Sequence, residues 1–205
     1  DVLPRAFNTM LSGRPGPVVV DIPKDVQNQS IEISAWPEPG VADPLPAPDA
    51  ALIARAAAMI NEAERPILYL GGGVVHSGAS ALAVALAEKA GLPTVMTLMA
   101  LGSMPSDHAL SLGMLGMHGA RCTNFALDEC DLLIAVGARF DDRATGKVAA
   151  FCPQAKIIHI DIDPAELDKI KTAHVGITGD VAAVLKLLSP EVDTQLRKRW
   201  LSHVA

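Results

Sequence analysis

Short apolar runs alternate with helix-like stretches through most of the sequence, and this alternation restricts the possible folds more than any other feature. Runs such as PILYL, LLIAV and KIIHI contain few polar residues. Strands of this kind are typical of parallel sheets covered on both faces, and the stretches between them have the apolar spacing of helices. The sequence therefore predicts an α/β fold: a doubly wound parallel sheet with helices on both faces.

The alternation begins after residue 48. Asp49 can cap a helix that runs to about Ala63, and Gly91 can end the next helix. We expect strands in 66–73, 93–99, 131–137 and 155–163, and helices in 49–63, 77–91, 119–130, 163–170 and 180–188.

The N-terminal stretch differs from the rest. GPVVVDIPKDV, residues 16–26, predicts a buried strand that lacks its usual neighbours. Residues 35–48 contain five prolines in 14 positions, which suits an extended linker. The polar, basic tail that begins at Pro190 predicts a solvated helix leading to a further domain. The predicted divisions are 1–30, a linker 31–48, a main domain 49–188 and a second linker 189–205.

Charge and cysteine content exclude several classes of protein. The 205 residues include 17 Lys plus Arg against 23 Asp plus Glu, with no basic block for nucleic acid. No apolar run approaches the ~20 residues that would span a bilayer. Cys122, Cys130 and Cys152 form no CxxC pair, which disfavours a disulfide framework or a zinc cluster and fits a cytoplasmic protein. Because the chain begins without Met, we expect it to be a piece of something longer.

A glycine turn follows the first predicted strand. Ligands of open α/β sheets bind at the carboxyl ends of the strands. Gly71, Gly72 and Gly73 follow the run ILYL, where their backbone could approach a phosphate closely. The pattern lacks the last glycine of G-x-G-x-x-G, because that position is His76. An ordinary glycine-rich turn is an equally good interpretation.

Four charges follow the run LLIAVG. Arg139 and Arg143 can each offer a fork of donors to a pyrophosphate or a carboxylate, and Asp141 and Asp142 can hold those forks in place. Either the four charges satisfy one another or a ligand does.

Acids follow two further runs. Asp161 and Asp163 come after KIIHI, where a carboxylate could accept hydrogen bonds from a ribose, and Asp180 comes after VGITG. Asp163 and Asp180 could equally cap the helices that follow them. Each feature alone favours a structural role, but a glycine turn, arginines and acids at one edge of a sheet together predict a dinucleotide pocket.

SLGMLGMHGAR, residues 111–121, predicts a loop. Its glycines are too frequent for a helix interior, and its methionines are too apolar for an exposed loop. Methionine packs well against flat rings, so this loop could line an isoalloxazine ring or, alternatively, pack in the core. His118 is a poor candidate for a catalytic base, because spacing reveals no carboxylate partner.

Five motifs carry a resemblance to a known family. They are, in order, GRPGPVVVDIPKDVQ, YLGGGV, SLGMLGMHGAR, AVGARFDDRATGK and IIHIDIDPAEL. Together the chain resembles the catalytic large subunits of the acetolactate synthase (acetohydroxyacid synthase) family, which are thiamine-diphosphate enzymes. The resemblance implies that 1–30 ends a pyrimidine-binding domain, that 49–188 is a Rossmann-like central domain, and that 189–205 approaches a pyrophosphate-binding domain.

The resemblance also implies that the central domain holds FAD, which is not used for net redox chemistry. Arg143 is implied in addition to recognise the carboxylate of the second 2-oxo acid. The implied FAD contacts are Gly71, Gly72, Gly73, Thr97, Leu98, Met114, Leu115, Gly116, Met117, His118, Gly137, Ala138, Arg139, Asp141, Arg143, Asp161, Ile162, Gly179 and Asp180.

The family's other functional groups are missing from these residues. Thiamine diphosphate and Mg²⁺ are held in the family by a Gly-Asp-Gly motif, but here Gly179 and Asp180 are followed by Val181, and the glutamate of the N-terminal domain is also missing. We therefore expect no catalytic or metal-binding residue here, and no activity from this fragment alone.

For the full enzyme the resemblance implies condensation of two pyruvates, or of pyruvate with 2-oxobutanoate, with loss of CO₂, in branched-chain amino-acid biosynthesis. It also implies a homo-oligomer, a dimer or tetramer, with a small regulatory subunit. The alternatives are a related carboligase or oxidase, such as glyoxylate carboligase or pyruvate oxidase, and a stand-alone module that binds NAD or ADP.

Overall fold

The computed structural model describes residues 2–204, and the chain divides into two compact units. The first unit ends at Leu45 and the second begins at Pro46. This division falls inside the proline-rich stretch 35–48, where the missing N–H groups of proline disfavour both helix and interior strand.

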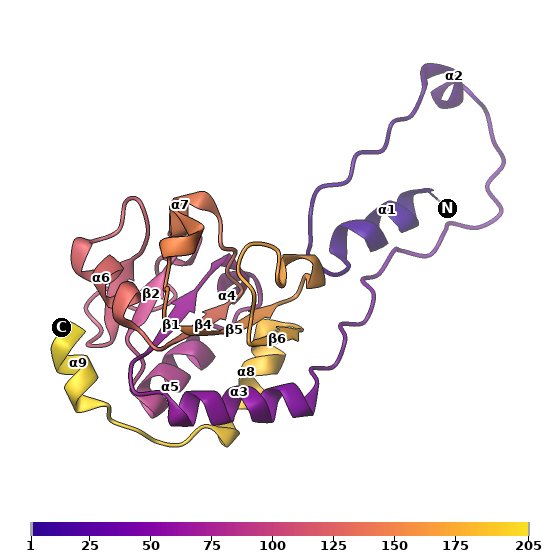
Figure 1. Cartoon of the computed structure of the whole chain (residues 1–205). Coiled ribbons are helices and arrows are strands. Elements are labelled where there is room, and N and C mark those ends of the chain that lie inside the picture. Colours follow the sequence, from indigo (N-terminus) through magenta and orange to yellow (C-terminus); the bar gives the residue numbers. More distant parts are fainter. Residues whose placement is uncertain (1, 205) are drawn as a thin grey trace. The chain divides into compact units, whose positions relative to one another are not determined.

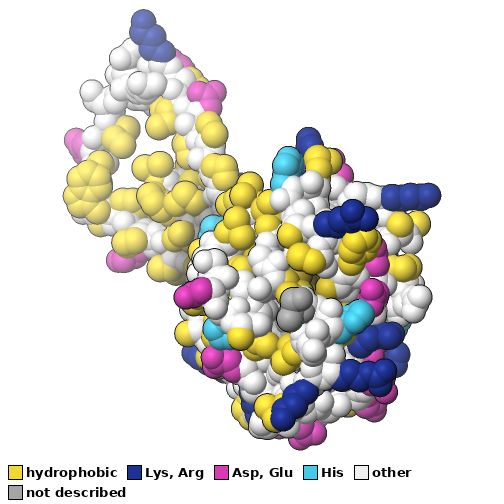
Figure 2. Space-filling view, turned by 90° about the vertical axis from the view of Figure 1, so that its left-hand side faces the viewer, with side chains coloured by type: hydrophobic (Ala, Val, Ile, Leu, Met, Phe, Trp, Pro, Cys, Tyr) yellow, Lys and Arg dark blue, Asp and Glu magenta, His cyan; other side chains and the backbone are white. Residues whose placement is uncertain are grey.

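The first unit contains two helices and extended chain. They are α1 (Val2–Leu11) and α2 (Lys24–Gln27). The buried strand predicted in 16–26 is wrong: residues 16–23 form no strand, and Val19 is 90% exposed. A strand needs a neighbour to pair with its backbone, and the described part of this unit offers none. Hydrophobic side chains accordingly gather on the surface of this unit (Figure 2).

The second unit is built around a six-stranded sheet in which every pairing is parallel (Figure 1). Its strand order is β3-β2-β1-β4-β5-β6, and helices cover both faces, so the predicted fold class is confirmed. The strands are β1 (Pro66–Leu70), β2 (Thr94–Met96), β3 (Ser111–Met114), β4 (Leu132–Val136), β5 (Lys156–Asp161) and β6 (Val175–Thr178).

The direction of winding reverses beside β1. The chain adds β2 and β3 on one side of β1 and then returns to add β4, β5 and β6 on the other side. The neighbouring strands β1 and β4 are therefore followed by loops that lead in opposite directions. Open α/β sheets bind ligands in the crevice between two such loops.

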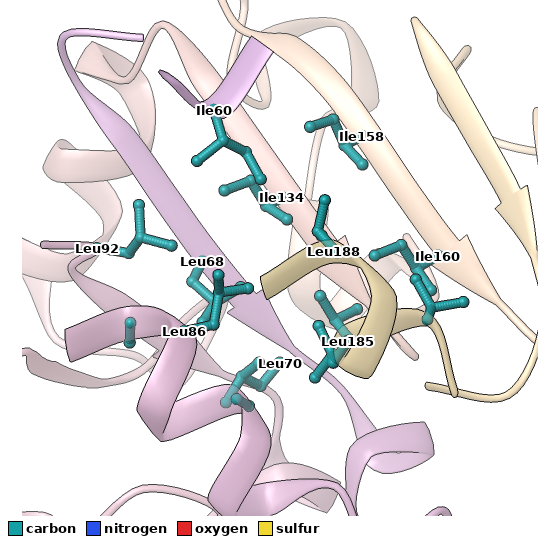
Figure 3. Close-up of a cluster of buried hydrophobic side chains, with 14 of the residues drawn as sticks. Ile60, Leu68, Leu70, Leu86, Leu92, Ile134, Ile158, Ile160, Leu185 and Leu188 are labelled. Atoms are coloured by element: carbon teal, nitrogen blue, oxygen red, sulfur yellow. The ribbon is translucent and has the colours of Figure 1, made fainter. Parts of the chain in front are cut away.

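One face of the sheet packs against three long helices. These are α3 (Ala50–Glu62), α5 (Ser80–Ala90) and α8 (Val181–Glu191). Alternate strand residues point into this layer, so that Leu68, Ile134 and Ile158 meet apolar side chains of the helices (Figure 3).

The opposite face packs against α6 (Arg121–Glu129) and against aromatic side chains. The tail contributes α9 (Lys198–Val204), whose Trp200 is only 4% exposed and donates a hydrogen bond from Nε1 to the Pro66 carbonyl at 3.0 Å. The prediction of a solvated tail helix is therefore wrong for Trp200, which belongs to this core.

Local end signals behave as the sequence predicts. The Asp49 carboxylate accepts a hydrogen bond from the Ala51 N–H at 2.8 Å, and Gly91 ends α5 with a φ of +58°. The predicted strand 93–99 is cut short, because η1 (Leu98–Ala100) follows β2, and the helix expected in 163–170 is a single 3₁₀ turn. The remaining short elements are α4 (Gly72–His76), α7 (Asp142–Thr145), η2 (Val148–Ala150) and η3 (Pro164–Glu166). No helix in residues 2–204 is long and apolar enough to cross a membrane.

Candidate functional site at the carboxyl edge of the sheet

The predicted site residues all lie at or after the carboxyl ends of the six parallel strands, and the fold brings these ends to one edge of the sheet. Backbone hydrogen bonds join neighbouring ends. The Thr97 N–H donates to the Leu70 carbonyl at 2.9 Å, and the Gly137 N–H donates to the Ile160 carbonyl at 2.8 Å. The Gly179 N–H donates to the backbone carbonyl of Asp161 at 2.9 Å. The edge is therefore one continuous surface.

The three glycines after β1 do not have the same surroundings. A Cβ at Gly71 or Gly73 would collide with the backbone of Gly137, lying 2.7 Å from its Cα in the case of Gly73. These two glycines let the turn after β1 touch the turn after β4. For both, the interpretation as an ordinary glycine-rich turn therefore holds. A Cβ at Gly72 would meet only the Cβ of Met99, at 3.2 Å. Gly72 is thus the least crowded member of the turn, because its only close neighbour is a side chain and not backbone.

The charged loop after β4 uses its aspartates and arginines differently. Asp141 caps α7 by accepting a hydrogen bond from the Ala144 N–H at 3.2 Å, and its carboxylate lies 3.9 Å from Arg139. Asp142 lies 4.0 Å from Arg143. The side chains of Arg139 and Arg143 are 53% and 71% exposed. Such long, exposed pairs contribute little to stability, so both guanidinium forks remain accessible to an anion.

The loop after β3 packs on the charged loop. The Met117 N–H donates to the Arg143 carbonyl at 2.9 Å, and Arg143 Nη1 lies 3.6 Å from the Met117 sulfur. Gly116 has a φ of +83°, and a Cβ there would collide with the Arg143 carbonyl. The predicted loop 111–121 needs a correction, because residues 111–114 form the edge strand β3.

Asn124 is a site residue that the sequence analysis missed. Its side-chain amide accepts from the Gly116 N–H at 2.9 Å and donates to the Gly116 carbonyl at 3.0 Å. No local signal marks it, because its partner lies eight residues earlier in the chain. Beside it lies a hollow of about 340 Å³ between α6 and the segment after α7. The lining residues are Gly116, Met117, Asn124, Leu127, Asp128, Ala144, Thr145, Gly146, Lys147, Ala150 and Phe151.

The acids at the edge also serve as local caps. Asp163 accepts from the Ala165 N–H at 2.9 Å, and Asp180 accepts from the Ala183 N–H at 3.0 Å. The capping interpretation is therefore confirmed for both. Asp161 is 7% exposed and accepts from the Asp163 N–H at 2.9 Å. Its contact with a ribose stays a prediction.

Thr97 carries a polar atom that the protein itself does not satisfy. Its Oγ1 is buried and, among the residues described, has no hydrogen-bond partner. An unpartnered buried hydroxyl costs free energy, so a ligand atom that paired with it would be bound more tightly. The adjacent side chains of Leu98 and Met99 are 71% and 68% exposed. The end of β2 thus combines an unused hydroxyl with an apolar surface.

The comparisons with known proteins agree with this geometry. The family model described as "Thiamine pyrophosphate enzyme, central domain" matches residues 53–188. The chain belongs to this family. The match contains every predicted site residue, from Gly71 to Asp180.

Three relatives from within this broad family are named as acetolactate synthase large subunits, one of them as probable. The chain is 58% identical over 204 residues to the acetolactate synthase isozyme 1 large subunit of Escherichia coli, covering 100% of this chain and 36% of the relative. It is 47% identical to the acetolactate synthase large subunit of Corynebacterium glutamicum, and the alignment covers 98% of this chain and 33% of the relative. It is 46% identical to a probable acetolactate synthase large subunit of Methanocaldococcus jannaschii, covering 97% and 35%. The predicted resemblance is confirmed, and the chain spans about a third of the length of these relatives.

The second compact unit extends beyond the matched range. The match ends at residue 188, but Arg197 donates hydrogen bonds to the carbonyls of Ile60, Ala63 and Ala90. Ile60 lies at the end of α3 and Ala90 at the end of α5. One guanidinium therefore holds two helix C-termini, whose last carbonyls lack partners within the helix.

Potential metal ligands are scattered over the second unit. Within residues 2–204 no three His, Cys, Asp or Glu side chains gather as a metal site would require. Cys122 is exposed, whereas Cys130 and Cys152 are buried free thiols.

Proposed function

We propose that this chain is the central part of an acetolactate synthase large subunit and that its carboxyl edge binds FAD. One observation carries the proposal: the glycine turn at Gly72, the hydroxyl of Thr97 that has no partner among the described residues and the exposed fork of Arg139 lie together at the edge where the strand order reverses. A dinucleotide offers the matching groups, namely a pyrophosphate, hydroxyls and flat rings.

The chain's own residues fit the parts of FAD. Gly72 and Arg139 would receive the pyrophosphate, because a glycine lets the backbone approach closely and an arginine offers paired donors. Asp161 and Asp180 would accept hydrogen bonds from hydroxyl groups. The apolar stretch 114–118 and Leu98 would lie against the isoalloxazine ring. When bound, FAD would supply that flat ring and its charge, and the resemblance implies no net redox step.

Arg143 would serve a different anion. Its guanidinium is more exposed than that of Arg139 and lies beside the sulfur of Met117. A guanidinium beside an apolar side chain suits a small 2-oxo acid, because the guanidinium can pair with the carboxylate and the apolar side chain can contact the alkyl group. We therefore propose Arg143 as the residue that receives the carboxylate of the acceptor.

The reaction of the whole protein extends this proposal. Two pyruvates, or pyruvate and 2-oxobutanoate, would be condensed with loss of CO₂, with thiamine diphosphate and Mg²⁺ held by parts of the protein outside these residues. Its partners would be the other domains of the chain, further copies of the subunit and a small regulatory subunit. Such an enzyme would work in the cytoplasm.

The test uses the purified full-length protein. We expect a flavin absorption band that survives gel filtration, and acetolactate production from pyruvate when thiamine diphosphate and Mg²⁺ are added. A colourless protein that also fails to bind added FAD would refute the flavin assignment. A flavin-bound protein that consumed glyoxylate instead of pyruvate would refute the assigned reaction and favour a related carboligase.

A further inference from the structure

Two buried polar side chains hold the loop that carries Arg139 and Arg143. The hydroxyl of Tyr69, the next-to-last residue of β1, donates to the Arg139 carbonyl at 3.0 Å. The ring Nε2 of His159, in β5, lies 2.9 Å from the Ala138 carbonyl. Both side chains are 0% exposed. The two strands on either side of β4 thus each send one polar group to adjacent carbonyls of the loop.

Burial sets the protonation state of both groups. Burial, followed by the nearby charge of Asp141, raises the pKa of the Tyr69 hydroxyl far above its ordinary value, so the group stays a donor. Burial lowers the pKa of His159, which keeps the ring neutral. Because a carbonyl can only accept, the Nε2 atom of this neutral ring carries the proton, and its buried Nδ1 has no partner among the described residues.

The loop also has an aromatic anchor between these two groups. The ring of Phe140 makes edge contacts with Tyr69, at a centroid distance of 5.9 Å, and with His159, at 5.1 Å. Ala138 and Phe140 are 1% and 3% exposed, whereas the intervening Arg139 side chain is 53% exposed. The backbone is therefore tied down on the inner side while the guanidinium points outward.

We propose that Tyr69 and His159 are positioning residues for ligand binding: through the carbonyls of Arg139 and Ala138 they fix the direction in which the loop presents its guanidinium groups. Neither residue needs to touch the ligand. Phenylalanine and leucine would fill the same buried space without needing any hydrogen-bond partner, so the polar atoms contribute mainly to position. The identity of the ligand rests on the proposed function, whereas the anchoring of the loop does not.

The test compares two deletions of a single buried hydroxyl in the full-length protein. Tyr69→Phe removes the hydrogen bond to the Arg139 carbonyl. The control Thr94→Val removes another buried hydrogen bond, from Thr94 Oγ1 to the Leu92 carbonyl, at the amino end of β2 and away from the site. We expect Tyr69→Phe to accelerate amide exchange in residues 137–147 roughly 3- to 10-fold, the effect of losing one hydrogen bond, and to weaken FAD binding by a similar factor. Thr94→Val should lower the melting temperature but change neither quantity.

A second pair of variants tests His159. His159→Gln keeps an amide donor that can reach a carbonyl, whereas His159→Leu keeps the volume without a donor. We expect the glutamine variant to recover most of the FAD affinity and loop protection that the leucine variant loses. Equal losses in the two, at equal melting temperatures, would refute a positioning role for the imidazole.

The outcomes separate this proposal from the proposed function. Unchanged exchange in residues 137–147 of Tyr69→Phe would refute the anchoring. Faster exchange with unchanged FAD affinity would refute the link between anchoring and ligand binding. If the unaltered protein bound no FAD, the proposed function would fall, and the exchange rates alone would decide whether Tyr69 holds the loop.

Discussion

At the scale of single residues, Arg139 and Arg143 differ in what lies beside them. Arg139 lies 3.9 Å from the carboxylate that caps α7, and its carbonyl is held by Tyr69. Arg143 belongs to α7 itself, is 71% exposed and contacts Met117. One guanidinium makes a good bidentate pair with only one anion at a time, so a loop that meets two anionic ligands needs both.

This difference predicts separable effects in the full-length protein. Arg143→Ala should retain FAD but lose acceptor recognition, with a cost of roughly 1.5 to 3 kcal/mol for a charged hydrogen bond. Arg139→Ala should lose FAD first. Arg143→Lys should recover little, because lysine keeps the charge without the planar fork. Flavin titration and acceptor-dependent kinetics measure the two effects. Equal loss of FAD affinity in both alanine variants, with unchanged acceptor dependence, would show that the two roles are assigned wrongly.

The glycine turn provides a matched pair of substitutions. Gly73→Ala would place a Cβ 2.7 Å from the Gly137 Cα, so we expect it to destabilise the apo protein by roughly 1 to 3 kcal/mol. Gly72→Leu has only the Met99 side chain beside it, and should weaken FAD binding more than it lowers apo stability. Thermal unfolding without flavin, followed by flavin titration, checks both. A collapse of the apo melting temperature in Gly72→Leu, with normal FAD binding by the folded fraction, would favour a purely structural turn.

At the scale of elements, the segment after α8 is fastened to the central domain. The Gln195 N–H donates to the Lys89 carbonyl at 2.9 Å, and Arg197 holds the ends of α3 and α5. Arg197 has a φ of +36°, which L-residues rarely adopt, so its side-chain bonds must compensate for a strained backbone.

We therefore expect Arg197→Ala to lower the free energy of unfolding by roughly 2 to 3 kcal/mol. The physical reason is that three helix-end carbonyls lose a charged donor at once. The measurement is urea unfolding. The control in the same segment is Arg199→Ala, because the exposed Arg199 side chain makes no hydrogen bond or ion pair with residues 2–204. Equal stability of the two variants would mean that 189–204 is a passive linker after all.

At the scale of the whole molecule, the chain corresponds to only part of the length of its relatives. The family match covers 53–188, and the relatives are about three times as long as this chain. The first unit exposes Val19 and Trp36 at 90% and 83%, and large apolar side chains exposed together are typical of a surface that a partner covers.

We predict that these 205 residues alone make no acetolactate from pyruvate, even with thiamine diphosphate, Mg²⁺ and FAD supplied. The Gly-Asp-Gly motif and the glutamate expected to serve thiamine diphosphate and its metal are missing from this sequence, and the condensation with loss of CO₂ would need that cofactor. A colorimetric acetolactate assay against a protein-free control measures it, with the full-length protein as the positive control. Turnover above the protein-free control would contradict the prediction.

Features that depend on neighbouring residues could be predicted from the sequence alone. The strands β1, β4 and β5 follow from short apolar runs in the sequence. Helix ends follow from contacts within a few residues, as at the caps Asp49, Asp163 and Asp180 and at Gly91, which ends α5. Because parallel strands end at one edge, the positions of the predicted site residues followed from the same pattern.

Only the tertiary structure decided the features that depend on distant partners. Residues 16–22 have a strand-like sequence but, within residues 2–204, no strand to pair with, whereas β3 becomes a strand despite Gly113 because β2 offers its edge. Tyr69 and His159 stand within apolar runs where no local pattern marks a role for them, and Trp200 lies in the tail that was predicted to be solvated. Each has a hydrogen-bond partner 21 to 134 residues away. Local patterns carry no information about such partners, because folding alone brings them within bonding distance.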